Sequence, residues 1–102
     1  MPLFAVYATD VANSIEKRAI VRPRHVARLE ALHAKGQIIL AGPCPTDHNT
    51  PPTGFTGSIL VLDFPDRATL DAWLAEEPYV LEGIYESVVV KPFIQTFIKS
   101  TV

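Results

Sequence analysis

The chain has 102 residues, about the length of one domain, so a single domain over residues 1–102 is predicted. Apolar residues make up 48% and charged residues 20%, a balance that supports a packed core and argues against long disordered stretches. The formal net charge of −2 offers no overall positive field for nucleic acid, and no apolar run approaches the roughly 20 residues of a membrane span, so neither is an expected partner.

Cysteine content and the N-terminal residues bear on the compartment. Cys44 is the one cysteine, so no internal disulfide can form. Residues 1–4 lack the basic segment and the long apolar run of a secretory signal. We therefore expect a cytoplasmic protein.

The first predicted elements are a strand and a helical segment. Residues 3–9 are apolar on both alternating sets of side chains, which is typical of a strand buried on both faces. Asn13 or Ser14 can then cap a helix. Helical spacing continues to Lys35, after which Gly36 provides the expected stop.

Pro23 interrupts the helical segment. A proline ring fits the first turn of a helix far better than the interior, where it removes a hydrogen bond and crowds the preceding turn. The sequence therefore predicts two helices, a short one over residues 15–21 and a longer one that starts near Pro23.

Strands dominate the second half of the chain. A second strand is predicted over residues 37–42, an exposed proline-rich loop over residues 43–54 and a third strand over residues 55–64. Asp66 can cap a helix over residues 67–75.

The last strand is predicted over residues 85–93, after a short turn or helix that starts at Pro78. Its side chains divide into two apolar sets: Tyr85, Val89 and Phe93 on one face, and Val88 and Val90 on the other.

The resulting order, βαββαβ, predicts an α+β, ferredoxin-like fold, in which the helices cover one face of a four-stranded antiparallel sheet. Three of the strands are apolar on both faces, so a second face left in water would expose more apolar surface than monomers usually tolerate. A second copy of the sheet is the economical cover, because two-fold self-association is the commonest soluble assembly. We therefore expect a homodimer through the open sheet face.

His25 is the first candidate for chemistry. On a helical wheel it falls within the apolar arc of Val26, Leu29 and Leu32, so its side chain is expected to point inward. One interpretation is a core histidine satisfied by a backbone carbonyl. The other is a general base or acid that faces a pocket, since imidazole titrates nearest to neutral pH.

A series of short motifs runs along the chain in a fixed order. They are Tyr7-Ala8-Thr9-Asp10, Ser14-Ile15-Glu16-Lys17-Arg18, Arg22-Pro23-Arg24-His25-Val26-Ala27-Arg28-Leu29, Ala41-Gly42-Pro43, Gly54-Phe55-Thr56-Gly57-Ser58, Pro78-Tyr79-Val80, Gly83-Ile84-Tyr85 and Val90-Lys91-Pro92-Phe93. With these motifs in this order and spacing, the sequence resembles the YciI-like, or YCII-related, family over nearly the whole chain. The resemblance implies a ferredoxin-like fold assembled as a dimeric α/β barrel.

The resemblance also implies a site in which the helix histidine, here His25, pairs with the acid of an Asp-Pro-Tyr motif. In this chain the motif is Glu77-Pro78-Tyr79, so His25 and Glu77 are the expected catalytic residues and Tyr79 is an expected substrate contact. Glutamate is one methylene longer than aspartate, so its carboxylate either reaches His25 from a shifted backbone or pairs more loosely. The alternative role for Glu77 is to cap the short helix at Pro78.

Three further residues are candidates for binding the substrate. Ser58 shares a strand face with Thr56, and its hydroxyl is expected to hold a substrate oxygen or, alternatively, to bond neighbouring backbone. Asp10 ends the first strand and matches the family, although bonding to local amides explains it equally well. Arg22 could draw an anionic substrate into a pocket.

The sequence shows no metal or cofactor motif. The three histidines share no HxxxH or HxH spacing, and no glycine-rich phosphate loop is present. What is present favours a lyase or isomerase that moves protons on a small molecule without a cofactor, with His25 as the base, Glu77 orienting it and Ser58 holding a substrate oxygen. The resemblance adds dehydrochlorinase-like or muconolactone-isomerase-like chemistry as a precedent. The alternative is a non-catalytic dimeric module that binds a small ligand in the same cleft.

Overall fold

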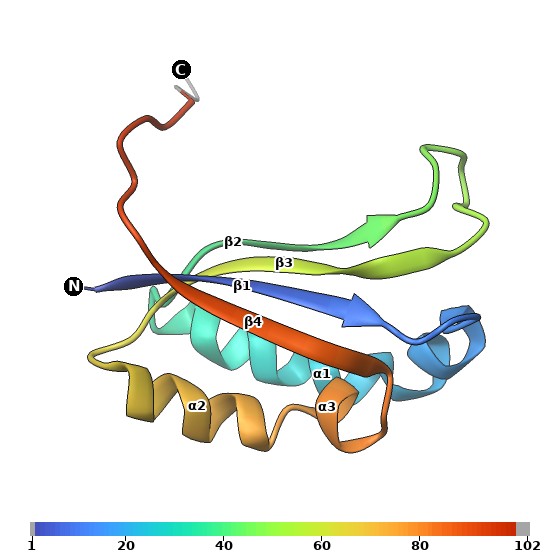
Figure 1. Ribbon diagram of the computed structural model, residues 1–102, viewed down its shortest axis with the longest axis horizontal. Coiled ribbons are helices and arrows are strands. Elements are labelled where there is room, and N and C mark those ends of the chain that lie inside the picture. The colour runs from blue at the N-terminus through green and yellow to red at the C-terminus, as the bar shows by residue number, and fades with distance from the viewer. Residues whose placement is uncertain (1, 100–102) are drawn as a thin grey trace.

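The computed structural model describes residues 2–99, which form four strands and three helices. In chain order these are β1 (Leu3–Asp10), α1 (Ile15–Ala34), β2 (Ile38–Pro45), β3 (Phe55–Asp63), α2 (Arg67–Ala75), α3 (Pro78–Leu81) and β4 (Tyr85–Phe93). The strands pair antiparallel in the order β2-β3-β1-β4, and the helices lie together on one face of the sheet (Figure 1). The predicted α+β, ferredoxin-like fold is therefore confirmed.

The predicted break at Pro23 was wrong, because α1 is a single helix of 20 residues that contains this proline. Pro23 lies on the exposed side of α1, as does Ala19, whose carbonyl would otherwise accept from residue 23. Water can bond that carbonyl, so the helix loses one internal hydrogen bond without burying an unpaired group. The helix ends as predicted, with Gly36 in the left-handed region at φ +72°. No described helix is long and apolar enough to span a membrane.

Strand β2 is longer than predicted. It continues through Pro43, Cys44 and Pro45, with Pro43 opposite Ser58 and Cys44 opposite Gly57 on β3, so the loop shortens to residues 46–54. Prolines are tolerated here because β2 is an edge strand, whose outer side has no partner that needs the missing N–H groups.

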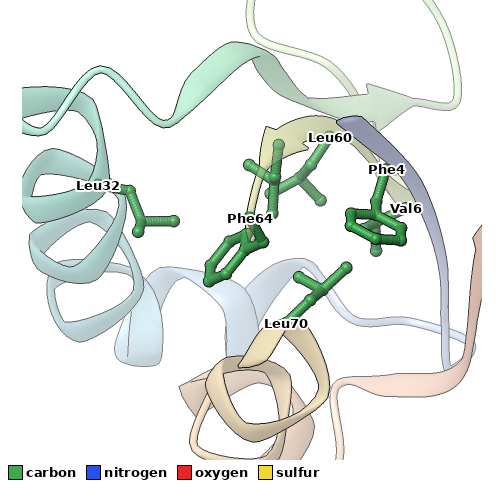
Figure 2. Close-up of a cluster of buried hydrophobic side chains, with 7 residues drawn as sticks. Phe4, Val6, Leu32, Leu60, Phe64 and Leu70 are labelled. Carbon is green, nitrogen blue, oxygen red and sulfur yellow. The ribbon is translucent and has the colours of Figure 1, made fainter. Parts of the chain in front are cut away.

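The core lies between the sheet and the helices. Its larger cluster, drawn in Figure 2, combines side chains of β1, β3, α1 and α2: Phe4, Val6, Leu32, Leu60, Leu62, Phe64 and Leu70. A second cluster lies toward α3 and contains Ala8, Val21, Ile84 and two tyrosines, Tyr79 and Tyr85. The first cluster is wholly apolar, whereas the second brings two phenol groups into the interior beside the polar residues described below.

A bulge determines where Tyr85 points. The pairing of β1 with β4 shifts between Thr9 and Asp10, and Asp10 then lies opposite Tyr85. One extra residue on a strand reverses the face that the following side chains occupy. Tyr85 is therefore buried beneath the helices near Val88, and its predicted place on the face of Val89 was wrong.

The face of the sheet without helices is open in the single chain. Ile59 of β3, Tyr7 of β1 and Val89 of β4 lie side by side on this face. Their exposed fractions are 45%, 48% and 47%. They border a hollow of about 430 Å³. Strand β1 is thus buried on its helix side alone, and the burial predicted for its other face requires a partner.

Candidate active site

His25 and Glu77 come together between α1 and the start of α3. The Nδ1 atom of His25 hydrogen-bonds with Oε1 of Glu77, and the two residues are only 8% and 2% exposed. Glu77 occupies the N-cap position of α3, where its Oε2 accepts from the backbone N–H of Tyr79 at 2.7 Å. The two roles that the sequence left open for Glu77, helix cap and histidine partner, are filled by its two carboxylate oxygens.

Tyr79 fixes the plane of the imidazole. The two rings stack with centroids 4.0 Å apart and planes 12° apart. Tyr79 is 1% exposed, and its hydroxyl donates to the backbone carbonyl of Arg18 at 3.4 Å. Burial raises the pKa of Tyr79, so the phenol stays neutral beside His25. Stacking and the in-plane bond to Glu77 together leave the imidazole little freedom to turn.

This arrangement distinguishes the two ring nitrogens of His25. An ionised Glu77 can only accept, so Nδ1 donates its hydrogen to Glu77, and in the neutral form of the imidazole Nε2 then keeps its lone pair. In the part of the chain that the structure describes, Nε2 makes no hydrogen bond, and His25 lines a cavity. A histidine held by a buried acid, with its second nitrogen available, has the geometry of a general base.

The cavity has a volume of about 190 Å³ and lies among α1, β2 and β3. Four polar residues line it, Arg18, Arg22, His25 and Ser58, and much of the remaining wall is apolar. Among the described residues, none with a carboxylate side chain lines it. Typical ligand pockets measure roughly 300–1,000 Å³, so this one suits a small molecule.

The predicted site residues divide into two groups. His25, Ser58, Arg22 and Tyr79 all line the cavity. Glu77 lies behind His25, and the side chain of Asp10 is fully buried behind Arg18. Cavity-lining residues can touch a substrate directly, whereas Glu77 and Asp10 can act only through the side chains they hold.

Arg18 and Asp10 form a buried ion pair that contacts Ser58. Arg18 donates from Nε and Nη2 to the two carboxylate oxygens of Asp10 at 2.6 and 2.9 Å, and Ser14 donates to the same carboxylate at 2.5 Å. Arg18 Nη2 also donates to the Gly57 carbonyl at 2.8 Å and to Ser58 Oγ at 2.9 Å. Burial alone would lower the pKa of Arg18, but the bonds to Asp10 and its charge outweigh burial and raise it. The guanidinium is therefore charged and fixed in position.

Ser58 is held by two donors. Its Oγ accepts from Arg18 and from the Tyr85 hydroxyl, the latter at 2.8 Å, rather than bonding neighbouring backbone. Burial raises the pKa of Tyr85 to about 12, although the Ser58 bond and the charge of Arg18 act to lower it. Tyr85 therefore stays protonated at neutral pH and continues to donate.

Gly57 lets the backbones of β1 and β3 approach closely beside this network. A Cβ atom at Gly57 would lie 2.0 Å from the carbonyl oxygen of Ala8, which no side chain could tolerate without a backbone shift. The glycine carbonyl is also an acceptor for Arg18, so the close approach helps to place the guanidinium.

Three residues of the network were not among the predicted site residues: Arg18, Ser14 and Tyr85. Arg18 had a usable signal, because it precedes His25 by seven residues and so shares its inward helix face. Ser14 precedes Arg18 by four and lies on the same side. Tyr85 had no signal, since its face depends on the bulge.

Metal-ligating groups were sought within the described residues 2–99. No three His, Cys, Asp or Glu side chains among them are grouped so that they could hold a metal ion. Arginine, histidine and serine side chains line the cavity described above.

The chain is similar to several bacterial proteins along its length. Protein YciI of Escherichia coli O6:H1 (strain CFT073) is 47% identical over 97 residues, which cover 93% of this chain and 99% of the relative, and the Shigella flexneri protein matches equally. An uncharacterized protein of Haemophilus influenzae is 41% identical over 96 residues, covering 92% and 98% of the two chains.

A solved enzyme has the same fold. The 5-chloro-2-hydroxyhydroquinone dehydrochlorinase TftG of Burkholderia phenoliruptrix AC1100, in complex with 2,5-dihydroxybenzoquinone, superposes with a TM-score of 0.80 at 25% identity, over 90% of this chain and 93% of that one. The YCII-related domain matches residues 2–94, which include every element from β1 to β4. The domain match over residues 2–94 and the identity with the YciI proteins over nearly their whole length together show that the chain belongs to the YCII-related domain family.

Proposed function

We propose that the protein is a cofactor-independent acid/base enzyme for a small, ring-derived molecule, with His25 as its general base. One observation carries the proposal: the His25 ring is held by buried Glu77 and stacked Tyr79, its Nε2 makes no hydrogen bond within residues 2–99, and His25 lines a cavity. Elimination is the favoured reaction, because a dehydrochlorinase shares the fold. Isomerisation needs the same base and is the second reaction type.

The proposed elimination assigns one step to each group. Nε2 of His25 takes a proton from the substrate, the released electron pair forms a double bond, and the leaving group departs with its own bonding pair. For a chlorinated ring the products are chloride and a dehydrochlorinated ring, a net loss of HCl. Glu77 accepts from Nδ1–H throughout and stabilises the imidazolium that forms. In an isomerisation the imidazolium instead returns the proton to another carbon.

The other candidate residues have supporting roles in this proposal. Ser58, Arg22 and Tyr79 line the cavity beside His25 and contact the substrate. Asp10 acts through Arg18, because its own carboxylate is enclosed by Arg18 and Ser14.

Turnover assays test the proposal. Chloride release from 5-chloro-2-hydroxyhydroquinone under anaerobic conditions reports elimination, and NMR of unsaturated lactones reports isomerisation. We expect the wild-type protein to turn over one of these substrates, and we expect the rate to be roughly 10²–10⁴-fold lower in His25→Gln. His33→Gln, on the exposed side of the same helix, is the matched control and should not change the rate.

Two results would contradict this function. An unchanged rate in His25→Gln would remove His25 as the base. Binding of both substrate classes without turnover of either would favour the alternative, a non-catalytic small-ligand-binding module.

We also propose that two copies pair through the helix-free sheet face. The exposed patch of Tyr7, Ile59 and Val89 supports this, since a face of that kind is costly to leave in water. Beyond β4 the chain runs away from the helices (Figure 1), and it carries Ile94 and Phe97 at 86% and 92% exposure. These residues extend the apolar surface available to a second copy.

A further inference from the structure

We propose that Arg18 and Ser58 together form an oxyanion-binding subsite in the cavity, and that the substrate is therefore a small ring compound whose acidic or enolisable oxygen binds there. This inference rests on the proposed function, because it concerns the same cavity, and it adds the substrate class and a binding residue, Arg18, that was not among the predicted site residues.

The first step concerns the unused donors of Arg18. Its Nε and Nη2 atoms carry three hydrogens and contact four acceptors, two oxygens of Asp10, the Gly57 carbonyl and Ser58 Oγ, so one Nη2 hydrogen is shared between two of them. Within residues 2–99, Nη1 makes none, and it is not among the buried polar atoms that lack a partner. A guanidinium is planar and rigid, so the bonds on one side fix the direction of the N–H groups on the other. Because Arg18 lines the cavity and Nη1 is its unused end, the proposed subsite takes the Nη1 N–H groups as the donors that face the cavity.

The second step concerns the hydrogen of Ser58. A serine hydroxyl has two acceptor lone pairs and one donor. Arg18 and Tyr85 occupy both lone pairs, at 2.9 and 2.8 Å, so only the O–H remains to be used. Tyr85 keeps its proton at neutral pH and so fixes the Ser58 hydroxyl, and Asp10 fixes the guanidinium of Arg18. The serine hydrogen and Nη1 are therefore a pair of donors whose positions are set by Tyr85 and Asp10.

The third step concerns charge. Arg18 and Arg22 both line the cavity, and within residues 2–99 no carboxylate side chain does, because Asp10 and Glu77 lie behind the residues that they hold. Asp10 offsets much of the charge of Arg18, so exposed Arg22 supplies the net attraction for an anion while Arg18 and Ser58 supply directed bonds. Such a site selects an oxygen that is already anionic or becomes so.

The last step links this subsite to the base. When His25 removes a proton from an enolisable or phenolic ring, the negative charge moves onto a ring oxygen. Two donors already in place stabilise that charge without reorganising, and they act strongly because the site is small and largely apolar. The remaining walls include Val26, Leu29 and Leu60, which suit ring carbons, and the volume of about 190 Å³ admits one ring.

A binding experiment with two ring compounds tests the inference. 2,5-Dihydroxybenzoquinone carries acidic oxygens, and 2,5-diaminobenzoquinone is a neutral ring of the same shape. Titration calorimetry on the full chain should show a preference for the acidic compound. We expect this preference to fall by roughly tenfold or more in Arg18→Lys and in Ser58→Ala, since each removes a bond to a charged oxygen. Arg24→Lys, at a side chain 58% exposed on the same helix, is the control and should keep it.

Further variants separate this inference from the proposed function. His25→Gln should lose turnover but keep the preference, and an equal loss of preference there would overturn the subsite by placing the anion on His25. The subsite would also be overturned if the Arg18→Lys and Ser58→Ala proteins melt cooperatively and keep the wild-type preference for the acidic compound. Equal binding of the two compounds by the wild-type protein would overturn it as well. Should Arg18→Lys fail to fold, Ser58→Ala decides. A preference that depends on Arg18 in a protein without turnover would support the subsite and refute the enzyme.

Discussion

Replacing Asp10 by alanine should strongly destabilise the fold. The side chain of Asp10 is fully buried, and its carboxylate accepts three hydrogen bonds, two from Arg18 and one from Ser14. The replacement would leave Arg18, whose side chain is 8% exposed, as an unpaired buried charge. Breaking such a pair costs about 3–5 kcal/mol. A domain of 102 residues has a free energy of unfolding of about 5–15 kcal/mol, so the loss is a large share of the total.

Urea unfolding at neutral pH, followed by Trp73 fluorescence and circular dichroism, measures this loss. The double variant Asp10→Leu with Arg18→Met should recover most of it, because neither charge is then buried alone. Asp71→Ala is the control, since Asp71 pairs with Arg67 at the surface, and its midpoint should barely move. A free energy of unfolding for Asp10→Ala within about 1 kcal/mol of the natural value would refute the reasoning, because the pair would then contribute no more than a surface ion pair.

Three other perturbations follow from the structure. Val89→Asp should convert a dimer into a monomer in sedimentation, because it would bury an unpaired charge in the open face, and an unaltered dimer would place the interface elsewhere. Tyr85 should not change the free energy of unfolding below pH 10, but this free energy should fall by about 2–3 kcal/mol as the pH rises toward 12. The reason is that the Tyr85 phenol loses its proton at a lower pH in the unfolded chain than in the folded one. The Tyr85→Phe variant should lack that decline. Gly57→Ala should lower the melting temperature and weaken binding of 2,5-dihydroxybenzoquinone. A melting curve like that of the wild-type protein would show that β1 and β3 can separate beside residue 57 at little cost.

Local patterns were sufficient to predict the element order and the direction of His25. Alternation marked the strands, and helical spacing placed His25 on the inward arc with Leu29 and Leu32. The histidine's partner could not be found this way, because Glu77 lies 52 residues away and its approach depends on how α3 packs against α1. Family resemblance supplied that partner.

The remaining errors concern features that depend on neighbouring elements. Whether Pro23 breaks a helix depends on which side of α1 meets water, and whether Pro43 ends a strand depends on whether β2 lies at an edge. The face of Tyr85 depends on a bulge that alternation alone cannot show. Helical spacing places Arg18 on the inward face with His25, but its partner Asp10 lies on β1, and only the fold brings the two together.

The prolines at the sheet edges also bear on aggregation. Both outer strands contain proline, at Pro43 and Pro45 in β2 and at Pro92 in β4, whereas the inner strands β1 and β3 contain none. A strand from another molecule can extend a sheet only where the edge offers N–H donors, and each proline removes one. The prolines therefore discourage chains that expose apolar side chains on one sheet face from joining edge to edge into fibres, whereas the proposed pairing through the open face needs no N–H group of an edge strand.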